Sequence, residues 1–197
     1  MKFVKERVNV ICQELARLSI SQKIKITDMQ VKNGCYITPA EADASEEPWT
    51  SFDTVNDRWY GPDKHYWFRT TITVPESFDG RNPQFLLFAN GEVIQGMDIN
   101  HREVLVRENA KAGEKIQLDL QSYTGTLHSE FRLLADLEEH DAKIEEIYYD
   151  LIVPMQGLNR MDEDNKTRLD LETALTNTIN LLDLRKPYSK EFYASIE

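Results

Sequence analysis

Residues 66–75, Tyr-Trp-Phe-Arg-Thr-Thr-Ile-Thr-Val-Pro, are the stretch that most constrains the fold. Aromatic and β-branched side chains suit a pleated, half-buried surface. From Trp67 onward successive side chains alternate between two faces, as they do in a strand. Pro75 cannot donate a ladder hydrogen bond and ends the strand. Residues 59–63, Trp-Tyr-Gly-Pro-Asp, supply turn chemistry just before it. The stretch predicts a long strand that follows an aromatic turn in a β domain.

Several further segments have the composition or alternation of strands, with turn residues between them. They are residues 20–29, 84–89, 92–97, 102–106, 115–123 and 130–137. Asn90-Gly91 is the strongest short-range hairpin signal, so we expect 84–89 and 92–97 to pair across it. Residues 39–57 are acidic and read as a long surface connection pinned by Trp49. Short strands at close spacing predict a β-sandwich or jelly roll rather than βαβ units.

Helical periodicity is found at both ends of the chain. Residues 2–17 form one amphipathic pattern, and residues 141–159 form another with a kink or break expected near Pro154. Asp162 is the expected cap of the next helix, and Ser189 opens the last one over residues 188–196. The sequence predicts a mainly β protein with appended helices. Its expected division is an N-terminal helix plus β-sandwich, 1–137, and a helical segment, 138–197.

Net charge excludes some partners. The chain carries a formal charge of −11 with a pI near 4.9. Nucleic acids and anionic membranes are bound through Lys and Arg, so neither partner is expected. The sequence has no apolar run long enough for a membrane span and no secretory signal. Its two cysteines, Cys12 and Cys35, form no disulfide or zinc pattern, so we expect a cytoplasmic protein.

Catalytic and metal-binding patterns are weak. His128 could join Glu130, or His140 could join Asp141, as two metal ligands, but zinc sites need three or four. The acidic run Asp136, Glu138, Glu139 and Asp141 could be a pair of catalytic carboxylates. With 34 acidic residues in the chain, such runs arise by chance, and ordinary surface groups are the favoured interpretation of both clusters.

The aromatic residues allow two interpretations. A group of rings could stack on the apolar face of a sugar: Trp49, Trp59, Tyr60, Tyr66 and Trp67. Alternatively, Trp59 and Trp67 fill the core of the sandwich and its interface with the N-terminal helix. The second interpretation is favoured.

Several separate segments resemble the N-terminal region of cytosolic α-mannosidases of glycoside hydrolase family 38. They are residues 59–63, 66–75, 86–98, 100–104, 123–125, 145–151, 169–171, 180–185 and 192–193. They occur in the family's order and span the chain from about Trp59 onward. One departure is the short connection between Val74 and Phe85, where the resemblance implies roughly one more strand.

The resemblance implies a galactose-binding-like β-sandwich, then helices that lead into a catalytic α/β barrel. That barrel would carry the zinc ligands and the aspartate nucleophile of a retaining glycosidase. Its opening His-x-Asp motif is absent here, so no catalytic residue or metal ligand is assigned, and no cofactor is expected in this chain. The expected partners are the barrel of the same polypeptide, an α-mannoside through the full enzyme, and a second copy of the protein.

Three functions remain open at this point. The leading one is an accessory domain that braces an α-mannosidase barrel and is inert alone. The second is a stand-alone carbohydrate-binding module, and the third is an independent enzyme that uses the His128 and His140 acidic patches. The candidate residues for carbohydrate binding or a domain interface are Trp59, Tyr60, Trp67 and His101.

Overall fold

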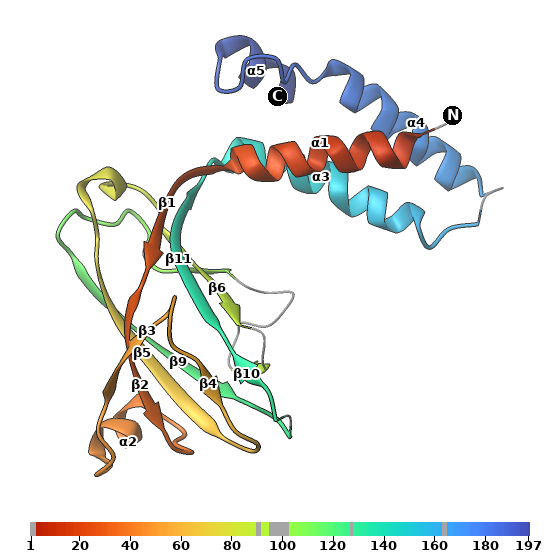
Figure 1. The fold of residues 1–197 in the computed structure, drawn as a ribbon. Coiled ribbons are helices and arrows are strands. Elements are labelled where there is room, and N and C mark those ends of the chain that lie inside the picture. Colours follow the sequence, from red (N-terminus) through yellow and green to blue (C-terminus); the bar gives the residue numbers. More distant parts are fainter. Residues whose placement is uncertain (1–2, 90–91, 95–102, 127, 163–164) are drawn as a thin grey trace. The chain divides into compact units, whose positions relative to one another are not determined.

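A computed structural model describes residues 3–89, 92–94, 103–126, 128–162 and 165–197 (Figure 1). Helix accounts for 37% of the chain and strand for 29%, so the protein is mixed rather than mainly β. The chain divides into a helical unit, residues 1–21 with 140–197, and a β unit, residues 22–139. None of the described helices has the length and apolar character that a membrane span requires.

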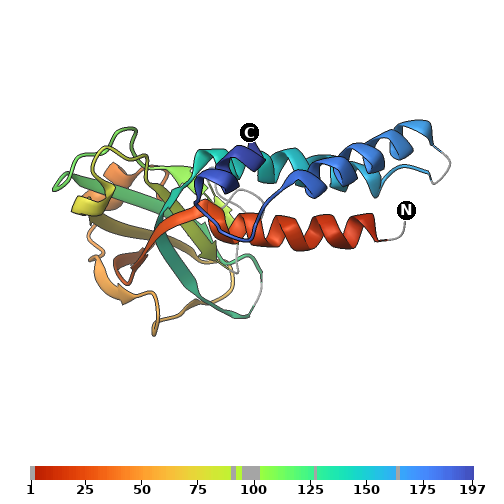
Figure 2. The same cartoon turned by 90° about the horizontal axis from the view of Figure 1, so that it is seen from above.

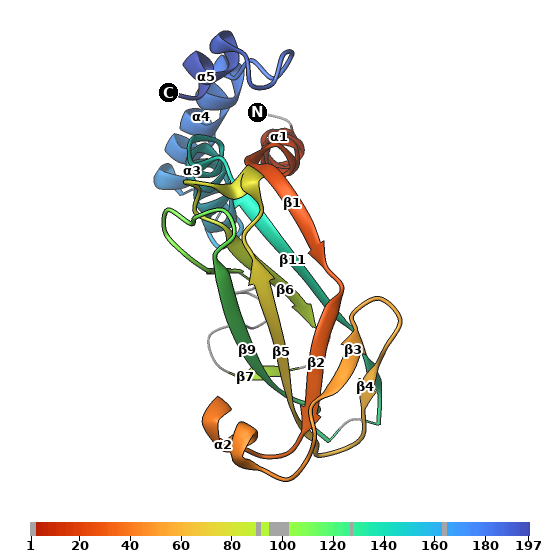
Figure 3. The ribbon, with the colours of Figure 1, turned by 90° about the vertical axis from the view of Figure 1, so that its left-hand side faces the viewer.

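The β unit contains open antiparallel sheets. The larger has the order β3-β2-β5-β9-β7 and the second has the order β1-β11-β6-β8 (Figure 3). A two-stranded ladder pairs β10 with β4. The strands are β1 Ile20–Ile26, β2 Asp28–Asn33, β3 Thr50–Asp53, β4 Trp59–Tyr60, β5 His65–Thr73, β6 Gln84–Ala89, β7 Glu92–Ile94, β8 Glu103–Leu105, β9 Lys115–Tyr123, β10 Glu130–Phe131 and β11 Leu133–His140.

The expected long strand is confirmed as β5, which lies at the centre of the larger sheet. It pairs with β2 on one side and with β9 along its whole length on the other, from His65↔Tyr123 to Thr73↔Lys115. Phe68 and Ile72 face a hydrophobic cluster that also takes Leu133 and Leu137 from β11, so both larger sheets contribute to one core. The alternation in the sequence therefore separated the two faces of this strand correctly.

The expected hairpin across Asn90-Gly91 is wrong, although the turn itself lies outside the described residues. β6 pairs with β11 and β8 in the smaller sheet, whereas β7 pairs with β9 in the larger one. The two strands that flank the turn signal thus belong to different sheets. Pairing with strands distant in sequence has overridden a strong local preference.

The helical unit contains α1 Val4–Ser19, α3 Ala142–Leu158, α4 Lys166–Leu181 and α5 Lys190–Ile196. Figure 2 shows α1, α3 and α4 lying side by side. Their apolar faces meet in a second hydrophobic cluster, with Leu15, Leu151 and Ile179 among its buried members. The sequence division at 137/138 grouped the first helix with the strands, whereas α1 packs on the C-terminal helices.

Two helix details differ from expectation. α3 continues through Pro154 to Leu158 without a break, and Leu151, Met155 and Leu158 on both sides of the proline are buried in the helical cluster. The cap of α4 is Asn165 rather than Asp162, since the Asn165 side chain accepts from the amide of Thr167. Ser189 caps α5 as predicted, accepting from the amide of Phe192.

Candidate functional site

Trp59 is a core residue and not a platform for a ligand. Its side chain is 1% exposed, and its ring lies 4.7 Å from Phe131 and 5.7 Å from both Tyr66 and Phe68, centre to centre. Aromatic rings at such separations and tilted orientations are typical of packed interiors. The indole nitrogen has no hydrogen-bond partner among the described residues.

Trp67 is buried on the opposite face of β5, with 2% of its surface exposed. It stands between Lys32 of β2 and Gln121 of β9, its direct partners across the sheet. Its indole nitrogen also lacks a hydrogen-bond partner among the described residues. The structure therefore separates Trp59 and Trp67 onto two faces of the sheet, and no surface presents them together.

Tyr60 is the exposed member of the aromatic group. Its side chain is 63% exposed, and its backbone carbonyl accepts a hydrogen bond of 2.7 Å from the hydroxyl of Tyr66. Tyr60 and Trp59 are neighbours in β4, so their side chains point to opposite sides. His101 lies outside the described residues.

The outer face of the larger sheet carries a cluster that the sequence patterns missed, centred on Arg69. The guanidinium donates to Asp43 from Nη1 at 2.6 Å and to Asp119 from Nε at 2.5 Å. It also lies 4.3 Å from the centre of the Trp49 ring, a cation–π distance. Trp49 in turn donates from its indole nitrogen to Asp43 at 3.0 Å. Hydrogen bonding to Arg69 holds the pKa of Asp43 below its usual value, even though burial acts in the other direction.

Lys32 occupies the neighbouring position on this face and is 2% exposed. Its ammonium donates to the carbonyl of Ala42, and it lies 5.6 Å from the ring centres of both Tyr36 and Trp49. Aromatic faces attract a cation most strongly where water is excluded. The cluster of Lys32, Tyr36, Asp43, Trp49, Arg69 and Asp119 is called the outer-face cluster below.

Part of the outer-face cluster could have been found from the sequence. Alternation from Trp67 places Arg69 on the same face, and an Arg beside a Trp in a central strand needs a partner there. The partners Asp43 and Trp49 come from residues 39–57, which the sequence predicts to be a surface connection. That segment contains the short helix α2, Pro39–Ala44, which Thr38 caps by accepting from the amide of Glu41.

The acidic run at the end of β11 is paired with basic groups. Glu138 is 1% exposed and accepts from Lys23 at 2.5 Å, and Asp136 accepts from the same ammonium at 2.8 Å. Burial disfavours the charged Lys23, but these two carboxylates raise its pKa. Glu139 lies 3.3 Å from Arg81. Asp136, Glu138 and Glu139 thus belong to an ion-pair network on a strand.

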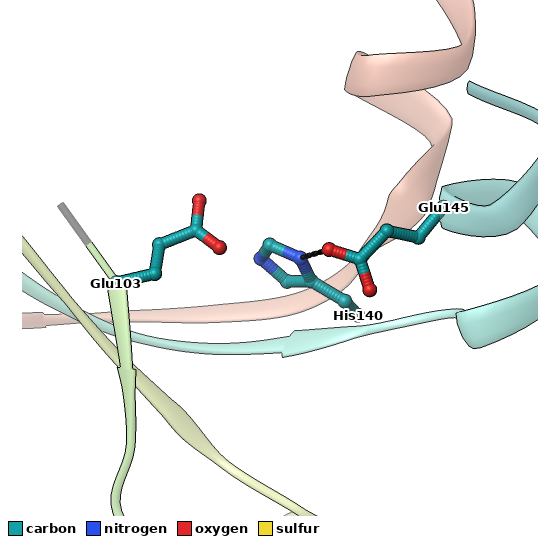
Figure 4. A group of neighbouring side chains, drawn as sticks. All are labelled: Glu103, His140 and Glu145. Atoms are coloured by element: carbon teal, nitrogen blue, oxygen red, sulfur yellow. Dashed lines mark hydrogen bonds and ion pairs between the residues drawn. The ribbon is translucent and has the colours of Figure 1, made fainter. Parts of the chain in front are cut away.

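The histidines do not form the metal pairs considered from the sequence. His140 Nδ1 lies 3.2 Å from Glu145 Oε1 rather than beside Asp141 (Figure 4). Asp141 uses one oxygen to cap α3, accepting from the amides of Lys143 and Ile144, and the other to accept from Tyr193 at 2.6 Å. His128 and Glu130 are both exposed.

Tyr123, one of the residues that carry the family resemblance, helps to close the end of the larger sheet. Its hydroxyl donates to Asp63 at 2.6 Å, and its ring stacks on His65 with centres 4.6 Å apart. Asp63 adopts a left-handed backbone with φ of 54°, and its amide donates to Gly125. The aromatic turn is thus fixed to the loop after β9 by polar contacts.

Neither the family models nor the curated proteins with which the sequence was compared include a match to this chain.

Proposed function

We propose that this chain is the N-terminal accessory module of a family 38 α-mannosidase and that it is inert alone as a hydrolase. Its role would be to brace a catalytic barrel in the same cytoplasmic polypeptide, where the zinc and the nucleophile would reside. The proposal rests first on the resemblance of the segments at 59–75 and 86–104 and of those in the C-terminal part. As part of it, we interpret the two larger sheets as a galactose-binding-like β-sandwich of jelly-roll type.

One observation favours an accessory role over sugar binding, namely the burial of Trp59 and Trp67. Their side chains are 1% and 2% exposed. A ring that stacks on a sugar must offer one face to solvent, and neither indole does so. In this fold Trp59 and Trp67 both stabilise the β unit. A structural role of this kind fits an accessory module.

Helix α4 offers a small exposed apolar surface for the bracing contact. Leu175 and Ile179 of α4 are buried within the helical unit, packed with residues of α1 and α3. Leu169 and Leu181 remain 52% and 74% exposed. These two leucines are the large apolar side chains of α4 that remain exposed for a catalytic barrel or for a second copy of the protein.

Hydrolysis of an aryl α-mannoside by the purified chain with added Zn²⁺ tests whether the chain alone is inactive as a hydrolase. The expected result is release of the aryl group at the rate of a Zn²⁺ blank. Faster release that disappears in His140→Ala would contradict the proposal. It would support the hypothesis that the chain is an independent enzyme. Stoichiometric zinc in the purified protein would point in the same direction.

A stand-alone carbohydrate-binding module is the second candidate, and the exposure of Tyr60 is the observation that favours it. A single ring supplies about 1 kcal/mol of stacking, too little by itself for micromolar affinity. Titration with methyl α-mannoside, followed by NMR of the aromatic protons, distinguishes the two candidates. Saturable shifts that are lost in Tyr60→Ala would support the binding module, and unchanged spectra at millimolar sugar would exclude it.

A further inference from the structure

The segment between β2 and β3 is a loop of residues 34–49 whose two ends are held together by the sheet. β2 pairs directly with β3, and Val31↔Thr50 closes the base of the loop. Compact loops of this length with adjacent ends can move without disturbing the structure on which they are built. Figure 3 shows α2, which belongs to this loop, beside the larger sheet. Detaching the loop therefore requires no strand to be broken.

The loop begins at Gly34, directly after β2. The φ of Gly34 is +151°, and a Cβ there would lie 2.4 Å from the Tyr36 ring. Glycine is thus required both for the backbone conformation and for the close approach of Tyr36. The Tyr36 carbonyl then accepts from Gln121 of β9 at 2.9 Å.

The loop is attached to the sheet by polar and cation–π contacts. Asp43 accepts two hydrogen bonds from Arg69, the Ala42 carbonyl accepts from Lys32, and the Trp49 ring covers Arg69. No residue of 34–49 belongs to the described hydrophobic cluster of the β unit. Ala42 is the one fully buried apolar residue of the loop, whereas Ile37 is 75% exposed. Segments with few buried apolar contacts open at low free energy.

The sheet surface next to the loop carries a row of three side chains, one of which has a buried polar atom without a hydrogen-bond partner among the described residues. Lys32, Trp67 and Gln121 form one row across β2, β5 and β9. The Trp67 indole nitrogen in this row has no hydrogen-bond partner among the described residues, and such a group costs free energy as long as water is kept away. Opening the loop would hydrate both this nitrogen and the Lys32 ammonium, which favours the open state.

We propose that residues 34–49 form a strap that opens and closes independently of the sheet. The Asp43–Arg69 ion pair holds the strap in its closed state. In the closed state the strap covers Lys32 and Trp67. In the open state it uncovers a row that presents an ammonium, an indole and an amide together. This inference concerns a conformational change of the β unit and stands whether or not the proposed accessory function is correct.

Hydrogen exchange followed by mass spectrometry tests the strap in the full chain. We expect amides of residues 36–49 to exchange at least about a hundredfold faster than those of β5 and β9. Asp43→Asn should speed exchange of the strap by about tenfold, since it removes a charge-assisted bidentate pair, and should leave β5 and β9 unchanged. Glu46→Gln is the matched control, because Glu46 is an exposed carboxylate on the same strap.

Acetylation of lysines gives a second, independent readout. Lys32 should react slowly in the unmodified protein and about tenfold faster in Asp43→Asn, relative to the exposed Lys25 in the same sample. The proposal is overturned if strap amides are protected as strongly as those of β5. It is also overturned if Asp43→Asn accelerates β5, β9 and the strap equally, because the strap would then open only by unfolding of the sheet.

Discussion

Arg69 holds its guanidinium 4.3 Å from the ring centre of Trp49 while it donates to Asp43 and Asp119. This one side chain connects a loop to the middle of the larger sheet through two kinds of contact, a cation–π contact with Trp49 and charge-assisted hydrogen bonds to Asp43. All three tryptophans of the protein lie in the β unit, so tryptophan fluorescence follows the unfolding of that unit alone.

Arg69→Gln should lower the free energy of unfolding of the β unit by about 1.5–3 kcal/mol, because two carboxylates lose a charge-assisted partner. The matched control is Arg107→Gln. Arg107 pairs with Glu114 at 2.9 Å but is 50% exposed, and such a pair contributes about 0–1 kcal/mol. Urea titrations followed by tryptophan fluorescence compare the two. Equal effects would mean that the outer-face cluster adds no more than a surface ion pair.

Trp59→Ala should destabilise the β unit by about 3–5 kcal/mol, since it opens a large cavity among Tyr66, Phe68 and Phe131. Trp59→Phe should cost much less, because the indole nitrogen makes no hydrogen bond to a described residue that would be lost. Tyr60→Ala, at the neighbouring exposed position, should change stability by about 0.5 kcal/mol or less. A Trp59→Ala protein as stable as Tyr60→Ala would show that Trp59 does not belong to the core.

Tyr193 should titrate with a pKa of about 12, raised first by its hydrogen bond to Asp141 and then by burial. The folded pKa is above that of the unfolded chain, near 10. The stabilisation is therefore complete below about pH 10 and is lost as the pH rises toward 12. Absorbance of phenolate at alkaline pH measures this titration. Tyr193→Phe should remove one late-titrating group, and a titration of Tyr193 near pH 10 would contradict the hydrogen bond.

The two cysteines should react with a thiol reagent at very different rates. Cys35 is exposed, whereas Cys12 is buried in the helical unit, where burial raises the pKa of its thiol. The thiolate is the reactive form, so the burial of Cys12 and its raised pKa both slow its reaction. We expect one fast equivalent, abolished by Cys35→Ser, and a second that appears on adding denaturant. Two fast equivalents would indicate that α1 does not pack as described.

The strongly patterned parts of the sequence predicted individual helices and strands correctly. Alternation over residues 66–74 identified β5, and three- and four-residue spacing identified α1 and α3 close to their observed bounds. Ser189 as the opening residue identified α5. These elements are set by local periodicity, which is visible in the sequence.

Contacts between distant segments were not predictable in the same way. The hairpin signal at Asn90-Gly91 is local, but β6 and β7 pair with β11 and β9, which lie far away in sequence. The attachment of Asp43 to Arg69 likewise spans 26 positions and depends on how the connecting loop folds back. Trp59 and Trp67 could be recognised as aromatic and β-forming, but only the structure separates them onto two faces.

The accessory function is the central claim, and one comparison of activity tests it most directly. Aryl α-mannoside hydrolysis with Zn²⁺ would be measured for this 197-residue chain and for the same gene product continued past Glu197. The account predicts no activity in the first and activity in the second. Hydrolysis by the 197-residue chain, or none in the continued protein, would contradict it.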